Sequence, residues 1–254
     1  MIVSSSGWIP SPPDARDHLY EPPEGFAATP AGVLSAEEHI LSILSQGGRP
    51  TCVNHAVAQQ VRAERHLAGD PAPELTSRAF GHYVSRATHT DPSLPGGTWF
   101  RAAYKAAAKV GLPPESAYPY VIGAERKMPD SDAFRQGYDA RLEFEFKRIP
   151  LVGEALTDAI DELLAREKTA VFGTRLTAYL SAANFSKGPA PAPKDGEQLG
   201  GGHGLLIAKR LADGTYLLVN SHGENSGLKG WWWVAREYIQ HPASEDFWHL
   251  EERK

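Results

Sequence analysis

The hydrophobic pattern of this chain changes its period near residue 168. Before that point apolar residues recur every three or four positions, as in amphipathic helices, and after it they form short β-prone runs separated by Gly, Asp and Asn. The pattern predicts helices at 51–68, 77–87, 99–110 and 150–166, and strands at 169–174, 204–210, 215–220 and 230–234. A helical first half and an antiparallel β-rich second half indicate an α+β fold with two lobes and a cleft between them.

Prolines are frequent in residues 1–35, where the sequence shows little periodicity. Proline is excluded from helix interiors and lacks the N–H that a β-ladder needs. We therefore expect an extended N-terminal arm at 1–35 and a catalytic domain at 36–254, with the helical lobe at about 40–150 and the β-rich lobe at about 151–254. Two alternatives stay open for the arm: it packs on the body, or it covers the cleft as a short inhibitory segment.

The composition and charge of the chain argue against several classes of function. The net charge is −5 and the basic residues are scattered, so nothing favours binding to nucleic acid or to an anionic membrane. No run approaches the roughly 18 apolar residues of a membrane span, and the N-terminus lacks the basic flank and apolar core of a signal peptide. We expect a cytoplasmic protein, unless a dedicated secretion system exports it.

Cys52 is the only cysteine, so it has no disulfide partner within the chain. A lone cysteine is most often a small buried hydrophobe. This one, however, falls in the first turn of the helix expected at 51–68, directly after a segment containing Gly47, Gly48 and Pro50. The free N–H groups and the positive dipole end of a helix N-terminus stabilise a thiolate. The position therefore favours a nucleophile.

A reactive thiol needs a proton partner, and His203 has the most specific setting of the ten histidines. It follows glycines 200–202 and opens an expected strand. The hairpin signal Asp213-Gly214 pairs that strand with the next one, and this pairing brings Asn220, at its far end, beside His203. Gln46 lies on the glycine loop six residues before Cys52, where its amide and the Cys52 N–H would form an oxyanion hole.

Two other kinds of site also use glycines or histidines, namely phosphate-binding loops and zinc sites, but the sequence does not fit either of them. A dinucleotide or phosphate loop would need GxGxxG or GxxxxGK[ST], and neither motif is present. Zinc would need ligands at short spacings, which a single cysteine and scattered histidines do not supply. We expect no cofactor and no metal.

The order Gln46, Cys52, His203, Asn220 resembles that of the papain-like cysteine peptidases, and the similarity extends from about residue 44 to residue 250. The Gln46–Cys52 spacing is that of the family's oxyanion glutamine and nucleophile. Residues 201–204, Gly-Gly-His-Gly, look like its Gly-Gly-His-Ala box, and residues 220–223, Asn-Ser-His-Gly, look like its Asn-Ser-Trp-Gly motif. The N-terminal start resembles that of bacterial members that lack a long propeptide.

The resemblance implies a two-lobed papain-like fold and a cysteine peptidase that acts on peptide or protein substrates. Cys52 is then the nucleophile, His203 its base, Asn220 the residue that orients the histidine, and Gln46 an oxyanion donor. Val53, His222 and Ser226 stand where the family has tryptophans. These departures keep two other functions open, namely a weak or inactive binding module, and the same thiol chemistry used for acyl transfer or deamidation.

Overall fold

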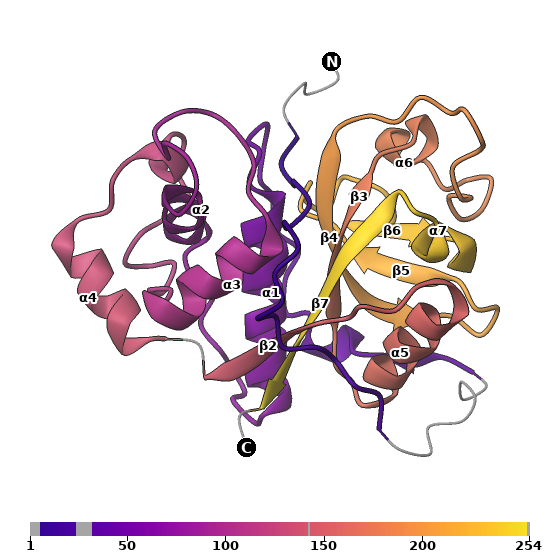
Figure 1. The fold of residues 1–254 in the computed structure, drawn as a ribbon, viewed down its shortest axis with the longest axis horizontal. Helices are drawn as coiled ribbons and strands as arrows, with labels where there is room; N and C mark the ends of the chain where they lie inside the picture. The colour runs from indigo at the N-terminus through magenta and orange to yellow at the C-terminus, as the bar shows by residue number, and fades with distance from the viewer. Residues whose placement is uncertain (1–5, 24–31, 142, 253–254) are drawn as a thin grey trace.

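The computed structural model describes residues 6–23, 32–141 and 143–252. A group of helices lies beside a twisted sheet with its own flanking helices, and the N-terminal segment runs between the two parts (Figure 1). The helices of the first half are η1 (Glu37–His39), α1 (Cys52–Leu67), α2 (Arg78–Ala87), α3 (Phe100–Lys109), η2 (Ala124–Arg126) and α4 (Ser131–Asp139). The helices of the second half are α5 (Gly153–Ala165), α6 (Ala178–Ala182) and α7 (Arg236–Gln240). This is the expected division into a helical and a β-rich lobe.

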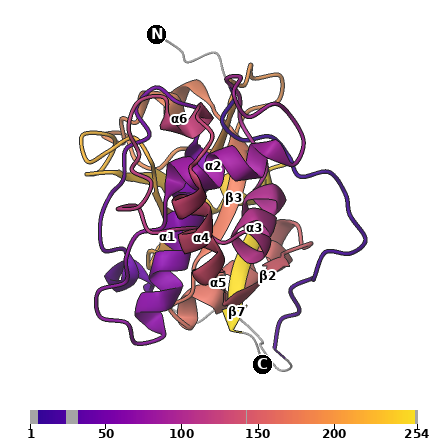
Figure 2. The ribbon, with the colours of Figure 1, turned by 90° about the vertical axis from the view of Figure 1, so that its left-hand side faces the viewer.

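Local sequence explains where the helices begin. The Ser77 side chain accepts the N–H of Phe80 and caps α2, and Asp130 caps α4 in the same way through Ala133. The four helices that the apolar period predicts are confirmed as α1, α2, α3 and α5. Helix α4 was not among the predicted helices. Most of α1 is buried, because the helical lobe packs on one side of it and strand β4 on the other. Figure 2 shows the helices in front of β3 and β7.

The sheet is antiparallel throughout, in the order β2-β7-β3-β4-β5-β6, with β1 paired to β4. Its strands are β1 (Leu34–Ser35), β2 (Phe144–Arg148), β3 (Ala170–Arg175), β4 (Gly202–Arg210), β5 (Tyr216–Val219), β6 (Trp231–Val234) and β7 (Ser244–Glu252). Strands β3 to β6 confirm the four expected runs. Strand β2 lies before residue 151, where we expect the β-rich lobe to start, because it pairs with β7 at the far end of the chain.

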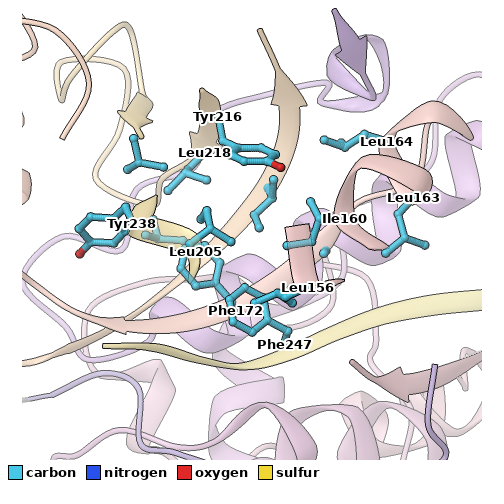
Figure 3. Packing of buried hydrophobic residues seen from close by; sticks show 14 of the residues in the cluster. Leu156, Ile160, Leu163, Leu164, Phe172, Leu205, Tyr216, Leu218, Tyr238 and Phe247 are labelled. Atoms are coloured by element: carbon cyan, nitrogen blue, oxygen red, sulfur yellow. The ribbon is translucent and has the colours of Figure 1, made fainter. Parts of the chain in front are cut away.

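Two clusters of buried hydrophobic side chains form the core of the protein. One joins α1, α2 and α3 to the inner face of the sheet and includes Cys52 and Trp248. The other fills the space between the sheet and α5 and α7, where Ile160 of α5 points toward Phe172 and Leu205 of the strands (Figure 3). Because the first cluster spans both lobes, the N-terminus of α1 is held firmly against β4.

No helix in the described parts of the chain has the length and apolar character that crossing a bilayer requires.

The N-terminal segment is tied to both lobes. The Arg101 side chain of α3 donates to the Asp17 carboxylate, and both side chains are buried. Further along, the N–H of Tyr20 donates to the Arg148 carbonyl at the edge of the sheet. Buried ion pairs of this kind depend on both partners being in place. The segment therefore follows a fixed path from the top of the lobe interface to β2 (Figure 1).

Candidate active site

Cys52 is the first residue of α1, and its thiol lies against the start of strand β4. The side chain is fully buried, and the N–H of Gly204 donates to its Sγ at 3.2 Å. A side chain at Gly204 would crowd Val53 and Phe100, so the glycine allows the strand to approach the helix N-terminus closely. The structure thus brings the thiol next to residue 204, the direct neighbour of His203.

His203 and Asn220 meet at the end of the β4–β5 pair. The His203 Nε2 lies 2.8 Å from the Asn220 Oδ1, and both side chains are buried. An amide oxygen only accepts, so this bond places the proton on Nε2 and leaves Nδ1 free to act as the base. Asn220 follows β5 directly, and its own N–H donates to the Gly230 carbonyl, which fixes its position.

Two further aromatic side chains surround the histidine. The rings of His222 and Trp232 lie 4.8 Å and 5.4 Å from the His203 ring. Trp232 is buried, whereas Trp231 and Trp233, on the other face of β6, are only partly buried. Trp232 therefore packs against the rings of both His203 and His222.

Gln46 lines a cavity of about 350 Å³ together with His203, His222 and Trp232. Its Oε1 accepts a hydrogen bond from the Ser221 hydroxyl, which joins the glutamine to the segment that carries Asn220. Its Nε2 donates to the carbonyl of Arg49 in the loop before Cys52. The amide is thus held on the same side of Cys52 as the cavity, and its nitrogen turns toward the loop.

Residues 6–9, the first residues that the structure describes, lie on top of the thiol, and we call them the arm tip. A Cβ added to Gly7 would stand 2.6 Å from Cys52 Sγ and 3.2 Å from the carbonyl carbon of Pro50. Glycine is therefore the residue that allows the backbone to pass this close to the sulfur. The sequence left open whether the arm lies on the body or over the cleft, and in the structure its tip lies in the cleft.

The arm tip forms hydrogen bonds to both lobes. The N–H groups of Gly7 and Trp8 donate to the Gly202 carbonyl at 3.1 and 3.3 Å, on the β-rich side. On the helical side, the N–H of Thr98 donates to the Gly7 carbonyl at 3.3 Å, and the N–H of Ile9 donates to the Thr98 carbonyl at 3.0 Å. The tip therefore bridges the two lobes directly above Cys52.

Burial controls the charge of the thiol and the imidazole. It raises the pKa of Cys52 to about 12, although the backbone N–H groups of Gly204, Val53 and Cys52 itself lower that pKa. Burial also lowers the pKa of His203 to about 3, with a further lowering from the His222 charge and an opposing effect from the Asn220 bond. Burial therefore favours the neutral thiol of Cys52 and the neutral imidazole of His203.

Sequence reasoning placed the arm over the cleft only as one of two alternatives, and it did not identify the Gly204 N–H or Gly7 as parts of this site. Gly7 is the only glycine in residues 1–24 and stands just before Trp8, which was a weak signal for a close approach of the backbone. Its partners Thr98 and Gly202 are about 90 and 195 residues away, so no local pattern could indicate them.

Comparisons with known proteins agree on the architecture. No protein-family profile matches this chain. Xylellain, a cysteine protease from Xylella fastidiosa, has a TM-score of 0.87 and 23% identity over 100% of this chain and 98% of its own. Procathepsin B S9 from Trypanosoma congolense has a TM-score of 0.72 and 13% identity, over 98% and 86% of the two chains.

A curated relative is known from sequence. An uncharacterized peptidase C1-like protein of Acanthamoeba polyphaga mimivirus is 24% identical over 219 residues, which is 84% of this chain and 70% of the viral protein. Identities this low establish the fold and leave the activity to be argued from the site. The expected fold is thus confirmed: this chain has the two-lobed fold of the papain-like cysteine proteases.

Proposed function

We propose that the chain is a cysteine peptidase that cleaves peptide or protein substrates through Cys52, His203 and Asn220. The observation that carries the proposal is that the start of β4 joins the Cys52 thiol to the His203–Asn220 pair. Cys52 opens α1, the N–H beside His203 contacts its sulfur, and Asn220 holds the histidine through Nε2. The papain-like fold supports the same chemistry.

The mechanism follows from these positions. His203 takes the Cys52 proton, and the thiolate attacks the amide carbonyl carbon to form a C–S bond. The oxyanion is stabilised by the Cys52 N–H and the Gln46 amide, which turns from Arg49 to the substrate. His203 then protonates the leaving amine as the C–N bond breaks. Water that gives its proton to His203 hydrolyses the thioester and restores the thiol.

The arm tip makes the described state a latent one. Gly7 occupies the space that a substrate carbonyl needs at Cys52, and the same contact excludes the water that would stabilise a thiolate and an imidazolium. Substrate must therefore displace the tip, or the tip must be removed, before the thiol ionises. The open cavity lined by Gln46 and Trp232 then accommodates the leaving-group side of the substrate.

Covalent labelling tests the proposal. The protein is incubated with an epoxide or vinyl-sulfone thiol probe after limited removal of the arm tip, and the modified residue is identified by peptide mass spectrometry. We expect a single label at Cys52, whose rate drops strongly in His203→Ala because the thiolate partner is lost. Equal labelling rates in the two proteins would contradict the assigned pair.

A second function has one observation in its favour. His222 stands beside His203, and burial lowers the pKa of both rings, which weakens His203 as a base. A weak or inactive papain-like binding module would fit that environment. Cys52 would then alkylate with the pH dependence of an ordinary thiol even after the tip is displaced, whereas a working pair reacts well below pH 8.5.

A further inference from the structure

A buried histidine outside the active site faces two glutamates with one ring nitrogen. His39, in η1, is 6% exposed, and its Nε2 forms no hydrogen bond among the described residues. Glu38 Oε1 lies 3.6 Å from this nitrogen, and Glu167 Oε2 lies 3.8 Å from it. Both distances are too long for a hydrogen bond. The nitrogen therefore lacks the partner that buried polar atoms nearly always have.

The other ring nitrogen of His39 contacts a second histidine. His39 Nδ1 lies 2.8 Å from Nδ1 of His66, in the last turn of α1. Two neutral imidazoles share one hydrogen at such a contact, because one nitrogen must donate and the other accept. When His39 donates, its Nε2 carries a lone pair that faces the two glutamates. Histidines that bind a metal ion through one nitrogen usually donate the other ring N–H to a neighbouring group in this way.

The charges around this lone pair attract a cation. Glu38 and Glu167 add two negative charges beside His39, and their only ion-pair contacts among the described residues are with that histidine. The nearby Lys168 pairs with Glu64 instead, at 2.9 Å. A lone pair and two carboxylates that face one point repel one another, and a divalent cation between them removes this repulsion.

The spacing of the three ligand atoms fits a small metal ion. His39 Nε2 and one oxygen from each of the two glutamates lie within 4.8 Å of one another. Ligand atoms about 2.0–2.2 Å from a tetrahedral Zn²⁺ stand roughly 3.3–3.6 Å apart. The glutamate side chains, Glu38 at 66% and Glu167 at 50% exposure, have room for the small inward movement that closes this geometry. An imidazole among the ligands favours Zn²⁺ over Mg²⁺ and Ca²⁺, which prefer oxygen alone.

We propose that Glu38, His39 and Glu167 form a binding site for a divalent transition-metal ion, with Zn²⁺ as the best match and water as the fourth ligand. His66 is the outer partner that fixes the His39 ring. The ion joins η1 to the turn that follows α5, and through His66 to the end of α1. It therefore ties the helical lobe to the β-rich lobe.

The role of this ion is structural. His66 lies about 21 Å along α1 from Cys52, so a metal ion at His39 takes no part in chemistry at the thiol. The site is thus independent of the proposed peptidase function. The sequence alone predicted no metal site, because Glu167 lies about 130 residues from His39 and spacing along the chain cannot show that the two meet.

Equilibrium dialysis of the untagged full-length chain measures the binding of Zn²⁺. Every sample carries Cys52→Ala, because a cysteine with a neighbouring histidine also binds Zn²⁺. We expect one Zn²⁺ per chain, and binding of Mg²⁺ that is at least about 100-fold weaker, since Mg²⁺ prefers an all-oxygen site. Absence of bound Zn²⁺ at about 0.1 mM free ion would overturn the proposal.

Three substitutions locate the bound ion. Glu38→Gln and Glu167→Gln remove one charge each from exposed side chains, and we expect each to raise the Kd for Zn²⁺ at least about tenfold. Glu37→Gln is the matched control, because Glu37 is the neighbour of Glu38 in η1 but pairs with Lys209. Its Kd should stay within about twofold of the parent value. Equal Kd values in all three variants would place the ion elsewhere and refute the assigned ligands.

Thermal unfolding tests whether the ion joins the lobes. At a Zn²⁺ concentration about 100 times the Kd, we expect the melting temperature to rise by about 5 °C or more over that in EDTA. Glu37→Gln should show the same rise. Tenfold weaker binding in Glu38→Gln gives about half of it or less at the same concentration. A full rise in Glu38→Gln and Glu167→Gln would contradict the site. Neither measurement involves hydrolysis, so a failure here leaves the peptidase function standing, and the reverse also holds.

Discussion

Replacing Gly7 with alanine is expected to uncover the Cys52 thiol. The new Cβ would stand 2.6 Å from Sγ and 3.2 Å from the Pro50 carbonyl carbon, about 1 Å inside normal contact with the sulfur. The thiol is buried at the start of α1 and Pro50 is backbone, so the arm tip is the part that can move. Gly7 has an ordinary φ, so the substitution adds volume without backbone strain.

The size of the effect follows from the pKa of the thiol. A pKa of about 12, against an ordinary value of 9.0, leaves about 1000-fold less thiolate near neutral pH. Displacing the tip admits water and relieves part of this penalty. We therefore expect the rate of alkylation of Cys52 at pH 7.5 to rise at least tenfold in Gly7→Ala, with about 1000-fold as the limit for an ordinary solvated thiol.

The assay is the rate of iodoacetamide addition, followed by intact-protein mass spectrometry under reducing conditions. Ile9→Ala is the matched control, because Ile9 belongs to the arm tip but is 39% exposed and its truncation leaves the backbone in place. Its rate should equal that of the unmodified protein. If Gly7→Ala is folded by near-UV circular dichroism and reacts at the unmodified rate, the tip does not control access to the thiol.

Three more predictions concern the site and the core. Gln46→Ala, in protein with the tip displaced, should lower kcat about 100- to 1000-fold with little change in KM, as measured by peptide hydrolysis, because an oxyanion donor is lost. Asn220→Ala should lower kcat about ten- to 100-fold, because the buried His203 Nε2–H loses its acceptor; an unchanged kcat would remove Asn220 from the site. Burial lowers the pKa of His249 to about 3, so the folded protein binds fewer protons there than the unfolded chain does between pH 6.5 and 3, and stability falls as the pH falls through this range. Between pH 7.5 and 5.0 this residue should cost about 2 kcal/mol in the free energy of unfolding by urea, and His249→Gln should lose correspondingly less stability on acidification.

Local patterns predicted the elements that carry the site. The apolar period and Ser77 predict α1 and α2 nearly to the residue, and the Asp213-Gly214 turn predicts the β4–β5 pair. Since that pair is antiparallel, the sequence predicts Asn220 beside His203, and the two side chains form a hydrogen bond in the structure. These features depend on residues that are close in sequence, so local sequence patterns can predict them.

The features that escaped prediction depend on contacts across the whole chain. Strand β7 contains Glu245, Asp246 and His249, and its polar residues hide its β character until its pairing with β2 and β3 is known. The placement of Gly7 on Cys52 depends on the arm crossing both lobes. Neither the β7 strand nor the position of Gly7 produces a local sequence pattern, because both depend on contacts with distant parts of the folded chain.

The proposed mechanism requires that Cys52 form a covalent acyl intermediate with help from His203. The most direct measurement is the mass of Gly7→Ala protein mixed for milliseconds to minutes with an activated ester of a peptide acid, followed by mapping of the adduct. We expect an acyl group on Cys52 that appears and then disappears as product forms, no adduct in Cys52→Ala, and slow, persistent acylation in His203→Ala. Product formation without an adduct, or an adduct elsewhere in the chain, would contradict it.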